Sequence, residues 1–125
     1  ENTKKKVPKF LKNYVSFNYS QARINLLNGQ IVSLFDQLPD ISPDIILLDG
    51  PNPQSVKGSY KGLKFSSGRA IIAADPILYE SSFPTKFFMI IDGRNKNAEF
   101  LRNNLKYKYN IKKNTSLKRF TFEKL

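Results

Sequence analysis

Residues 44–51 read DIILLDGP, an uninterrupted apolar run that ends in aspartate, glycine and proline. Residues 87–94, which read FFMIIDGR, repeat the arrangement of an apolar run followed by Asp-Gly. Strands that are buried on both faces have this composition, and they belong to parallel sheets that helices cover. The two stretches therefore predict neighbouring parallel strands, both buried, at the centre of an α/β domain.

Shorter signals on either side predict the remaining elements. Asn28-Gly29 lies between two apolar runs and predicts a β-hairpin, because both central positions of a type I′ turn need a positive φ. Alternation of apolar and polar residues predicts a strand over residues 15–19. Residues 54–69, rich in Gly, Ser and Lys, predict a long loop over the carboxyl edge of the sheet. Helices are predicted over residues 70–83 and 96–107, and two closing strands over residues 109–113 and 119–123.

The order of these elements predicts a mostly parallel sheet with helices on both faces. Strands that alternate with helices are joined by right-handed crossovers, which place helices on the two sides of a sheet. The closing pair adds one antiparallel strand. Residues 1–14 are interpreted as a basic lead-in and residues 15–125 as one domain, the number that a chain of 125 residues allows.

The composition excludes several classes of site. The chain has no Cys and no His, which excludes disulfides, zinc sites built on these residues, and nucleophilic mechanisms that require them. A hard cation held by carboxylates alone stays open, but we predict no metal site. No apolar run approaches the roughly 20 residues of a membrane span, so we expect a cytoplasmic protein without a membrane partner.

The net charge of +11 allows two interpretations. A strongly basic chain can bind nucleic acid or another polyanion. The alternative is compositional bias, because the cations are mostly Lys and are spread along a chain that is also rich in Asn, Ile and Phe. Clusters are confined to Lys4-Lys5-Lys6 and residues 106–119. Nucleic acid is therefore the less favoured partner.

The two Asp-Gly pairs are the strongest candidate for a functional site. Ligands of open α/β sheets bind outside the carboxyl ends of the strands, where we expect Asp49 and Asp92. Their carboxylates could bind an amine, a hydroxyl or a cation. We expect both to open into one cleft, within roughly 10 Å of each other, beneath the loop over residues 52–69. The alternative is that each pair only ends a strand, since both residue types are common in turns.

Neighbouring residues complete the predicted cleft. Arg94 precedes the amino end of a predicted helix, where it can bind a carboxylate or phosphate; the alternative is a surface cation. The predicted substrate-binding residues are Pro51, Asp92, Arg94 and Asn97. Neither G-x-G-x-x-G nor G-x-x-x-x-G-K-[ST] occurs in the sequence, which therefore encodes no nucleotide-binding loop and identifies no cofactor-binding residue.

Several segments together resemble a bacterial branch of the class I S-adenosylmethionine-dependent methyltransferases. In that branch an LP…PD-apolar-DGP segment precedes a D-x-L-x-x-E helix and a DGR-x-x-N-A-x-F-L segment. The resemblance covers roughly residues 15–125. The matching segments are residues 17–20, 28–30, 38–51, 74–80 and 90–101.

This resemblance implies a Rossmann-like fold of the methyltransferase type, with the chain as its carboxyl-terminal part and the amino-terminal half missing. It also implies that S-adenosylmethionine is the cofactor of the complete protein, held mainly by a glycine-rich loop before Glu1. The chain would then supply the substrate side of the cleft. Asp49 would be the catalytic carboxylate that orients or deprotonates the methyl acceptor. A small-molecule or carbohydrate-type substrate fits this interpretation, and the resemblance names no single acceptor.

Two functional hypotheses follow. The first is a fragment of a methyltransferase-like protein, and the alternative is a non-enzymatic basic module that binds nucleic acid or another polyanion. A further expectation concerns the sheet edge beside residues 45–48. With half a sheet missing, that edge would expose unpaired backbone groups and apolar surface, and we expect another copy of the chain or the missing segment to cover it.

Overall fold

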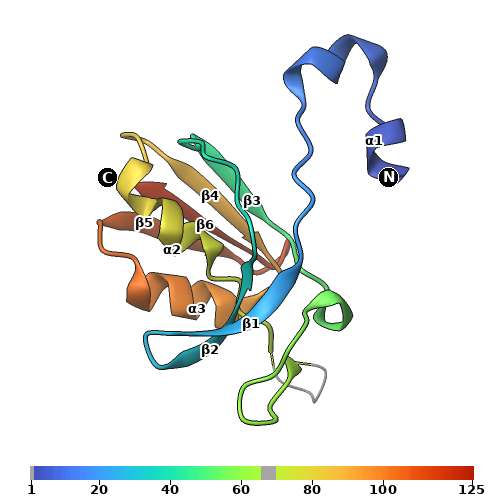
Figure 1. The fold of residues 1–125 in the computed structure, drawn as a ribbon. Coiled ribbons are helices and arrows are strands. Elements are labelled where there is room, and N and C mark those ends of the chain that lie inside the picture. The colour runs from blue at the N-terminus through green and yellow to red at the C-terminus, as the bar shows by residue number, and fades with distance from the viewer. Residues whose placement is uncertain (1, 66–69) are drawn as a thin grey trace.

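Two separate β-sheets and three short α-helices make up the computed structural model, which describes residues 2–65 and 70–125 (Figure 1). The first sheet is an antiparallel hairpin of two strands. The second has four strands in the order β3-β4-β6-β5. The strands are β1 (Ala22–Leu27), β2 (Gln30–Phe35), β3 (Ile45–Leu48), β4 (Phe88–Asp92), β5 (Tyr109–Asn114) and β6 (Arg119–Lys124).

The β1–β2 hairpin forms where the Asn-Gly pair predicted it. Asn28 has a φ of 50° and Gly29 a φ of 77°, so both central residues adopt the left-handed conformation that a type I′ turn requires. The strand predicted over residues 15–19 is wrong, because that segment has no regular secondary structure. It follows helix α1 (Asn2–Lys5) and a 3-10 helix (Lys9–Tyr14), and Figure 1 shows this part of the chain extending away from the sheets.

The parallel pairing of β3 with β4 confirms the prediction made from the two apolar stretches. Ile45 lies opposite Phe88, and Leu48 lies opposite Ile91. β6 pairs antiparallel with β4, and β5 pairs antiparallel with β6. The parallel arrangement brings the carboxyl ends of β3 and β4 to the same edge of the sheet, and this edge carries the candidate site.

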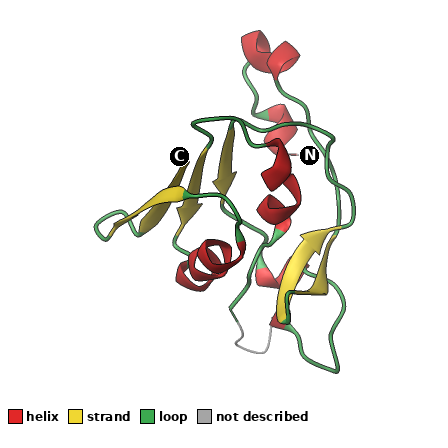
Figure 2. Cartoon of the chain, turned by 90° about the vertical axis from the view of Figure 1, so that its left-hand side faces the viewer, coloured by secondary structure: helices red, strands yellow, loops and turns green. Residues whose placement is uncertain are grey.

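Helices α2 (Asp75–Tyr79) and α3 (Asn95–Asn104) lie on one side of the four-stranded sheet (Figures 1 and 2). The core forms between that side and the helices, and Val32 of the hairpin contributes to it. The β3 strand also turns apolar side chains away from this core: Ile45 and Leu47 keep 65% and 66% of their surface exposed. Central members of the core are Phe87, Met89, Ile91, Ala98, Leu101 and Phe122.

The expectation of a Rossmann-like, mostly parallel sheet with helices on both faces is wrong. Only the β3–β4 pair of the four-stranded sheet is parallel, and the hairpin forms a second sheet of its own. The prediction that both apolar strands are buried fails for β3, where Ile45 and Leu47 are exposed. A continuous apolar run shows that both faces of a strand are apolar, but it does not show that a helix covers each face.

The helix predicted over residues 70–83 begins only at Asp75. The residues before it are extended, because they pair with the hairpin. The N–H of Ser33 donates to the carbonyl of Ile72 at 2.8 Å, and the N–H of Ala74 donates to the carbonyl of Ser33 at 3.1 Å. These tertiary hydrogen bonds override the helical pattern, and the extended segment connects the two sheets.

The long loop predicted over residues 54–69 was expected to lie over the carboxyl edge of the sheet, but part of it lies beside the hairpin instead. Lys57 runs beside β1: its N–H donates to the carbonyl of Ala22, and its carbonyl accepts from the N–H of Ile24, both at 2.9 Å. A 3-10 helix, Pro53–Ser55, lies earlier in the loop, and residues 66–69 fall outside the described part of the chain. Among the described residues, no helix has the length and apolar character needed to cross a membrane.

Candidate functional site

A pocket of about 500 Å³ lies at the carboxyl ends of β3 and β4. Asp49 and Asp92 both line it, together with Arg94 and Asn97, so four of the predicted residues share one concavity. Pro51 is not among the described lining residues. The remaining lining residues are Pro53 from the loop after β3, Ala70 and Ile71 from the segment before α2, and Gly93, Asn95 and Lys96 around the start of α3.

The two carboxylates differ in their surroundings. Asp92 lies opposite Arg119 on β6, and its Oδ1 accepts a hydrogen bond from the Arg119 Nε at 3.3 Å. Asp49 is exposed and has no hydrogen-bond or ion-pair partner within residues 2–65 and 70–125. The charge of Asp92 is therefore partly compensated inside the protein, whereas the Asp49 carboxylate is free to accept a hydrogen bond from a ligand.

Arg94 connects the turns that follow the two parallel strands. Its Nη2 donates to the carbonyl of Pro51 at 3.0 Å, which joins the turn after β3 to the turn after β4. Gly93 makes the second turn with a φ of 66°, and its N–H donates to the carbonyl of Lys118 at 2.8 Å. A guanidinium has five N–H donors, so Arg94 can hold this turn and still offer hydrogen bonds to an anionic group. Pro51 contributes through its carbonyl.

Asn97 has a positioning role that the sequence did not indicate. Its side chain is fully buried on α3, and both ends of its amide bind the backbone of Ala73. The Oδ1 accepts from the Ala73 N–H at 2.9 Å, and the Nδ2 donates to the Ala73 carbonyl at 3.0 Å. Asn97 therefore holds the extended segment that forms one wall of the pocket.

Two further carboxylates, both buried, stabilise the framework away from the pocket. Glu80, in a 3-10 helix (Glu80–Ser82), accepts from the backbone N–H groups of Lys106 at 2.8 Å and Tyr107 at 3.0 Å. The hydroxyl of Tyr109 also donates to it at 2.7 Å, and burial followed by this contact raises the pKa of Tyr109. Burial likewise raises the pKa of Asp75, whose Oδ1 accepts from a backbone N–H of β2.

The described residues contain no group of three or more acidic side chains placed to hold a metal ion. Within the same described part of the chain, the sheet edge instead forms a polar pocket with one unpaired carboxylate, one paired carboxylate and a guanidinium. Such a pocket can orient a hydroxyl or amine group and accept its proton. No family model matches this chain, and no curated protein or solved structure is detectably similar to it.

Proposed function

We propose that this chain supplies the acceptor side of an S-adenosylmethionine-dependent methyl-transfer site, with Asp49 as the carboxylate that binds the acceptor. The observation that carries the proposal is the position of Asp49: an exposed, unpartnered carboxylate within the described residues, in the pocket at the ends of two parallel strands. The resemblance of the DGP and DGR segments to methyltransferases gives that pocket its reaction class.

The chemistry assigned to this chain is the handling of the acceptor. The Asp49 carboxylate accepts a hydrogen bond from the acceptor hydroxyl or amine, and it takes up the proton as the new bond to carbon forms. Arg94 donates to the Pro51 carbonyl, which ties the backbone that follows Asp49 to the turn that follows Asp92. Positioning of this kind lowers the barrier because it removes the entropy cost of bringing the reacting groups together.

The residues at the pocket fit one wall of a site for this cofactor. When bound, S-adenosylmethionine supplies an electrophilic methyl group on a positively charged sulfur. The carboxylates of Asp49 and Asp92 complement that positive charge. The sequence has no glycine-rich nucleotide-binding motif, so the proposal assigns the adenosine to no residue of this chain.

The test compares two carboxylates at opposite ends of β3. Asp49→Asn removes the proton acceptor at the carboxyl end, and Asp44→Asn is the matched control, an exposed aspartate just before the strand. Formation of S-adenosylhomocysteine is measured for the intact protein with a panel of small hydroxyl and amine acceptors. We expect Asp49→Asn to reduce turnover about 100-fold or more, as loss of a general base does, and Asp44→Asn to leave it unchanged.

Two results would contradict the proposal. One is that the intact protein does not bind S-adenosylmethionine in a calorimetric titration. The other is that Asp49→Asn and Asp44→Asn retain the same turnover. In either case the pocket at the sheet edge would not be a methyl-transfer site.

One observation favours the alternative of polyanion binding. Residues 112–119, at the tip of the β5–β6 hairpin, are all exposed and include Lys112, Lys113, Lys118 and Arg119. Binding to phosphates through several such cations would weaken steeply with salt, with a slope of about −0.7 to −0.9 in log K per log salt for each phosphate contacted. An affinity for single-stranded RNA that falls in this way, and that Lys112→Gln with Lys113→Gln reduces, would favour the alternative.

A further inference from the structure

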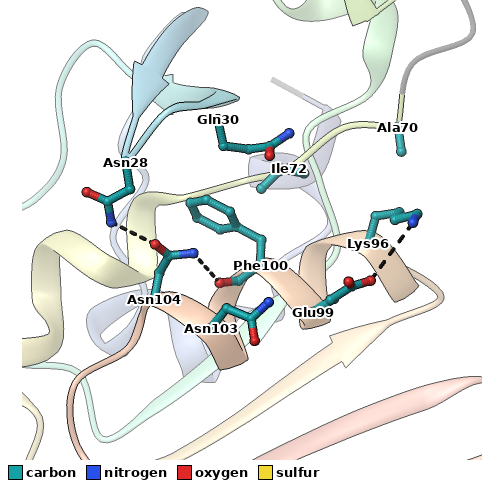
Figure 3. Close-up of a pocket in the computed structure, with 9 residues that line it drawn as sticks. All are labelled: Asn28, Gln30, Ala70, Ile72, Lys96, Glu99, Phe100, Asn103 and Asn104. Carbon is teal, nitrogen blue, oxygen red and sulfur yellow. Dashed lines mark hydrogen bonds and ion pairs between the residues drawn. The ribbon is translucent and has the colours of Figure 1, made fainter.

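A second cavity, of about 380 Å³, lies between the turn of the β1–β2 hairpin and α3 (Figure 3). Its volume falls at the lower end of the range of roughly 300–1,000 Å³ in which proteins bind small molecules. Asn28, Gln30, Asn103 and Asn104 contribute side-chain amides to its walls. The remaining lining residues are Ala70, Ile72, Lys96, Glu99 and Phe100.

Two of the four amides are fixed by a short chain of hydrogen bonds. The Nδ2 of Asn28 donates to the Oδ1 of Asn104, and the Nδ2 of Asn104 donates to the Phe100 carbonyl, both at 2.7 Å (Figure 3). The left-handed backbone of Asn28 at the hairpin turn brings its side chain to α3. These bonds connect the hairpin turn to the helix and so fix this side of the cavity.

The other two amides are available to a ligand. Gln30 and Asn103 are exposed, and neither side chain has a hydrogen-bond partner within the described part of the chain. Figure 3 shows the Gln30 amide above Ile72 and the Asn103 amide on the helix side of the cavity. Each primary amide presents an acceptor oxygen and a donor NH₂ group, so each can bind a hydroxyl in either direction.

The charges in this cavity cancel, although the chain as a whole has a net charge of +11. Lys96 and Glu99 are the charged lining residues, and they face each other with the Lys96 Nζ 3.9 Å from the Glu99 Oε2. A cavity built for a phosphate or carboxylate would present unpaired cations or guanidinium groups instead. The lining therefore favours a neutral ligand that carries several hydroxyl groups.

The aromatic side chain in the wall discriminates between two kinds of neutral ligand. Phe100 keeps only 7% of its surface exposed, so the part of its ring that reaches the cavity is too small for a nucleobase to stack on. It forms an apolar floor together with Ile72, which is also buried. A sugar ring matches this lining, because its C–H groups can pack on the floor while its hydroxyls bind the amides.

The cavity adjoins the pocket that contains Asp49, since Ala70 and Lys96 line both. We infer that the amide-lined cavity binds a neutral sugar ring, which extends toward Asp49 and carries the hydroxyl that is methylated. The position of that hydroxyl rests on the proposed function, whereas the sugar binding itself does not. The substrate class is therefore a neutral glycoside.

The experiment measures binding of neutral methyl hexosides, methyl β-D-glucopyranoside and methyl β-D-galactopyranoside, by saturation-transfer NMR and by titration of a ¹⁵N-labelled protein. Adenosine and glucuronate serve as comparison probes. We expect at least one hexoside to bind and to shift the side-chain amide signals of Gln30 and Asn103. Gln30→Ala and Asn103→Ala should each raise its Kd about three- to tenfold, because each removes a hydrogen-bonding side chain.

Asn110→Ala is the matched control, because Asn110 is an exposed asparagine on β5 that does not line the cavity. The Kd of this variant for the hexoside should equal that of the unsubstituted protein. Binding of adenosine but of neither hexoside would overturn the inference, and so would a Kd that Gln30→Ala and Asn103→Ala leave unchanged. Hexoside binding without any methyl transfer would refute the proposed function alone, and Asp49-dependent transfer without hexoside binding would refute the sugar inference alone.

Discussion

Replacement of Asn97 by alanine tests whether one buried amide holds the wall of the Asp49 pocket. In the native structure both ends of the Asn97 amide bind the backbone of Ala73, at 2.9 and 3.0 Å. Ala73 keeps only 1% of its surface exposed, so its N–H and carbonyl lose their partner in a place that solvent scarcely reaches. We therefore expect a large loss of stability from a substitution that introduces no clash.

The size of the loss follows from the two orphaned groups. A buried backbone donor or acceptor without a partner costs about 1–3 kcal/mol. The costs of two such groups add, but some water enters the space left by the side chain and binds them in part. We therefore expect a decrease of about 2–5 kcal/mol in the free energy of unfolding. With a urea m-value of about 2 kcal/mol/M, the unfolding midpoint should fall by about 1–2.5 M.

The assay is equilibrium unfolding in urea, followed by far-UV circular dichroism and tyrosine fluorescence. Asn103→Ala is the control, because Asn103 lies on the same helix but is exposed; its free energy of unfolding should change by less than about 0.5 kcal/mol. The reasoning is refuted if Asn97→Ala costs less than about 1 kcal/mol, or if the two variants unfold at the same midpoint.

Three further predictions concern buried acids and the open sheet face. Burial raises the pKa of Asp75, so the contribution of this residue to stability falls as pH rises from about 4 toward neutrality. The amide oxygen of an Asp75→Asn variant can still accept from the Phe35 N–H. That variant should therefore be more stable at pH 7 and should depend less on pH, as measured by urea titrations at several pH values. Burial and then Glu80 raise the pKa of Tyr109, so stability should fall as pH rises above about 10, and Tyr109→Phe should remove part of that fall in alkaline unfolding curves. Leu47→Lys should change stability by less than about 0.5 kcal/mol and weaken any self-association seen by sedimentation, and unfolding of that variant would show that the exposed face belongs to the core.

Local signals predicted the parts of the fold that depend on few residues. Asn28 and Gly29 predicted the hairpin because the turn itself demands positive φ. The parallel pairing of β3 with β4 followed from two similar apolar stretches. The sequence could not predict which face of β3 is covered by the core. Ile45 and Ile46 are equally apolar, but Ile45 is exposed and only Ile46 packs against the core.

Long-range hydrogen bonds explain the parts that the sequence did not predict. The residues before Asp75 have a helical apolar pattern, but Ser33 binds their backbone and keeps them extended. Asp49 and Asp92 could be placed in one pocket because both lie at the carboxyl ends of neighbouring parallel strands. The role of Asn97 could not, because its partner, Ala73, lies 24 residues earlier in the chain and no local pattern connects the two.

The contacts of Glu80 fix the path of the chain just after α3. That carboxylate binds the N–H groups of Lys106 and Tyr107, two and three residues after the helix ends at Asn104, so the chain must leave α3 at a fixed height and on a fixed side. One residue inserted into α3 would rotate everything after it by about 100° and move it about 1.5 Å along the axis. The strand that follows would then arrive out of register with β6. Insertions and deletions in this helix are therefore tolerated far less well than substitutions on its exposed side.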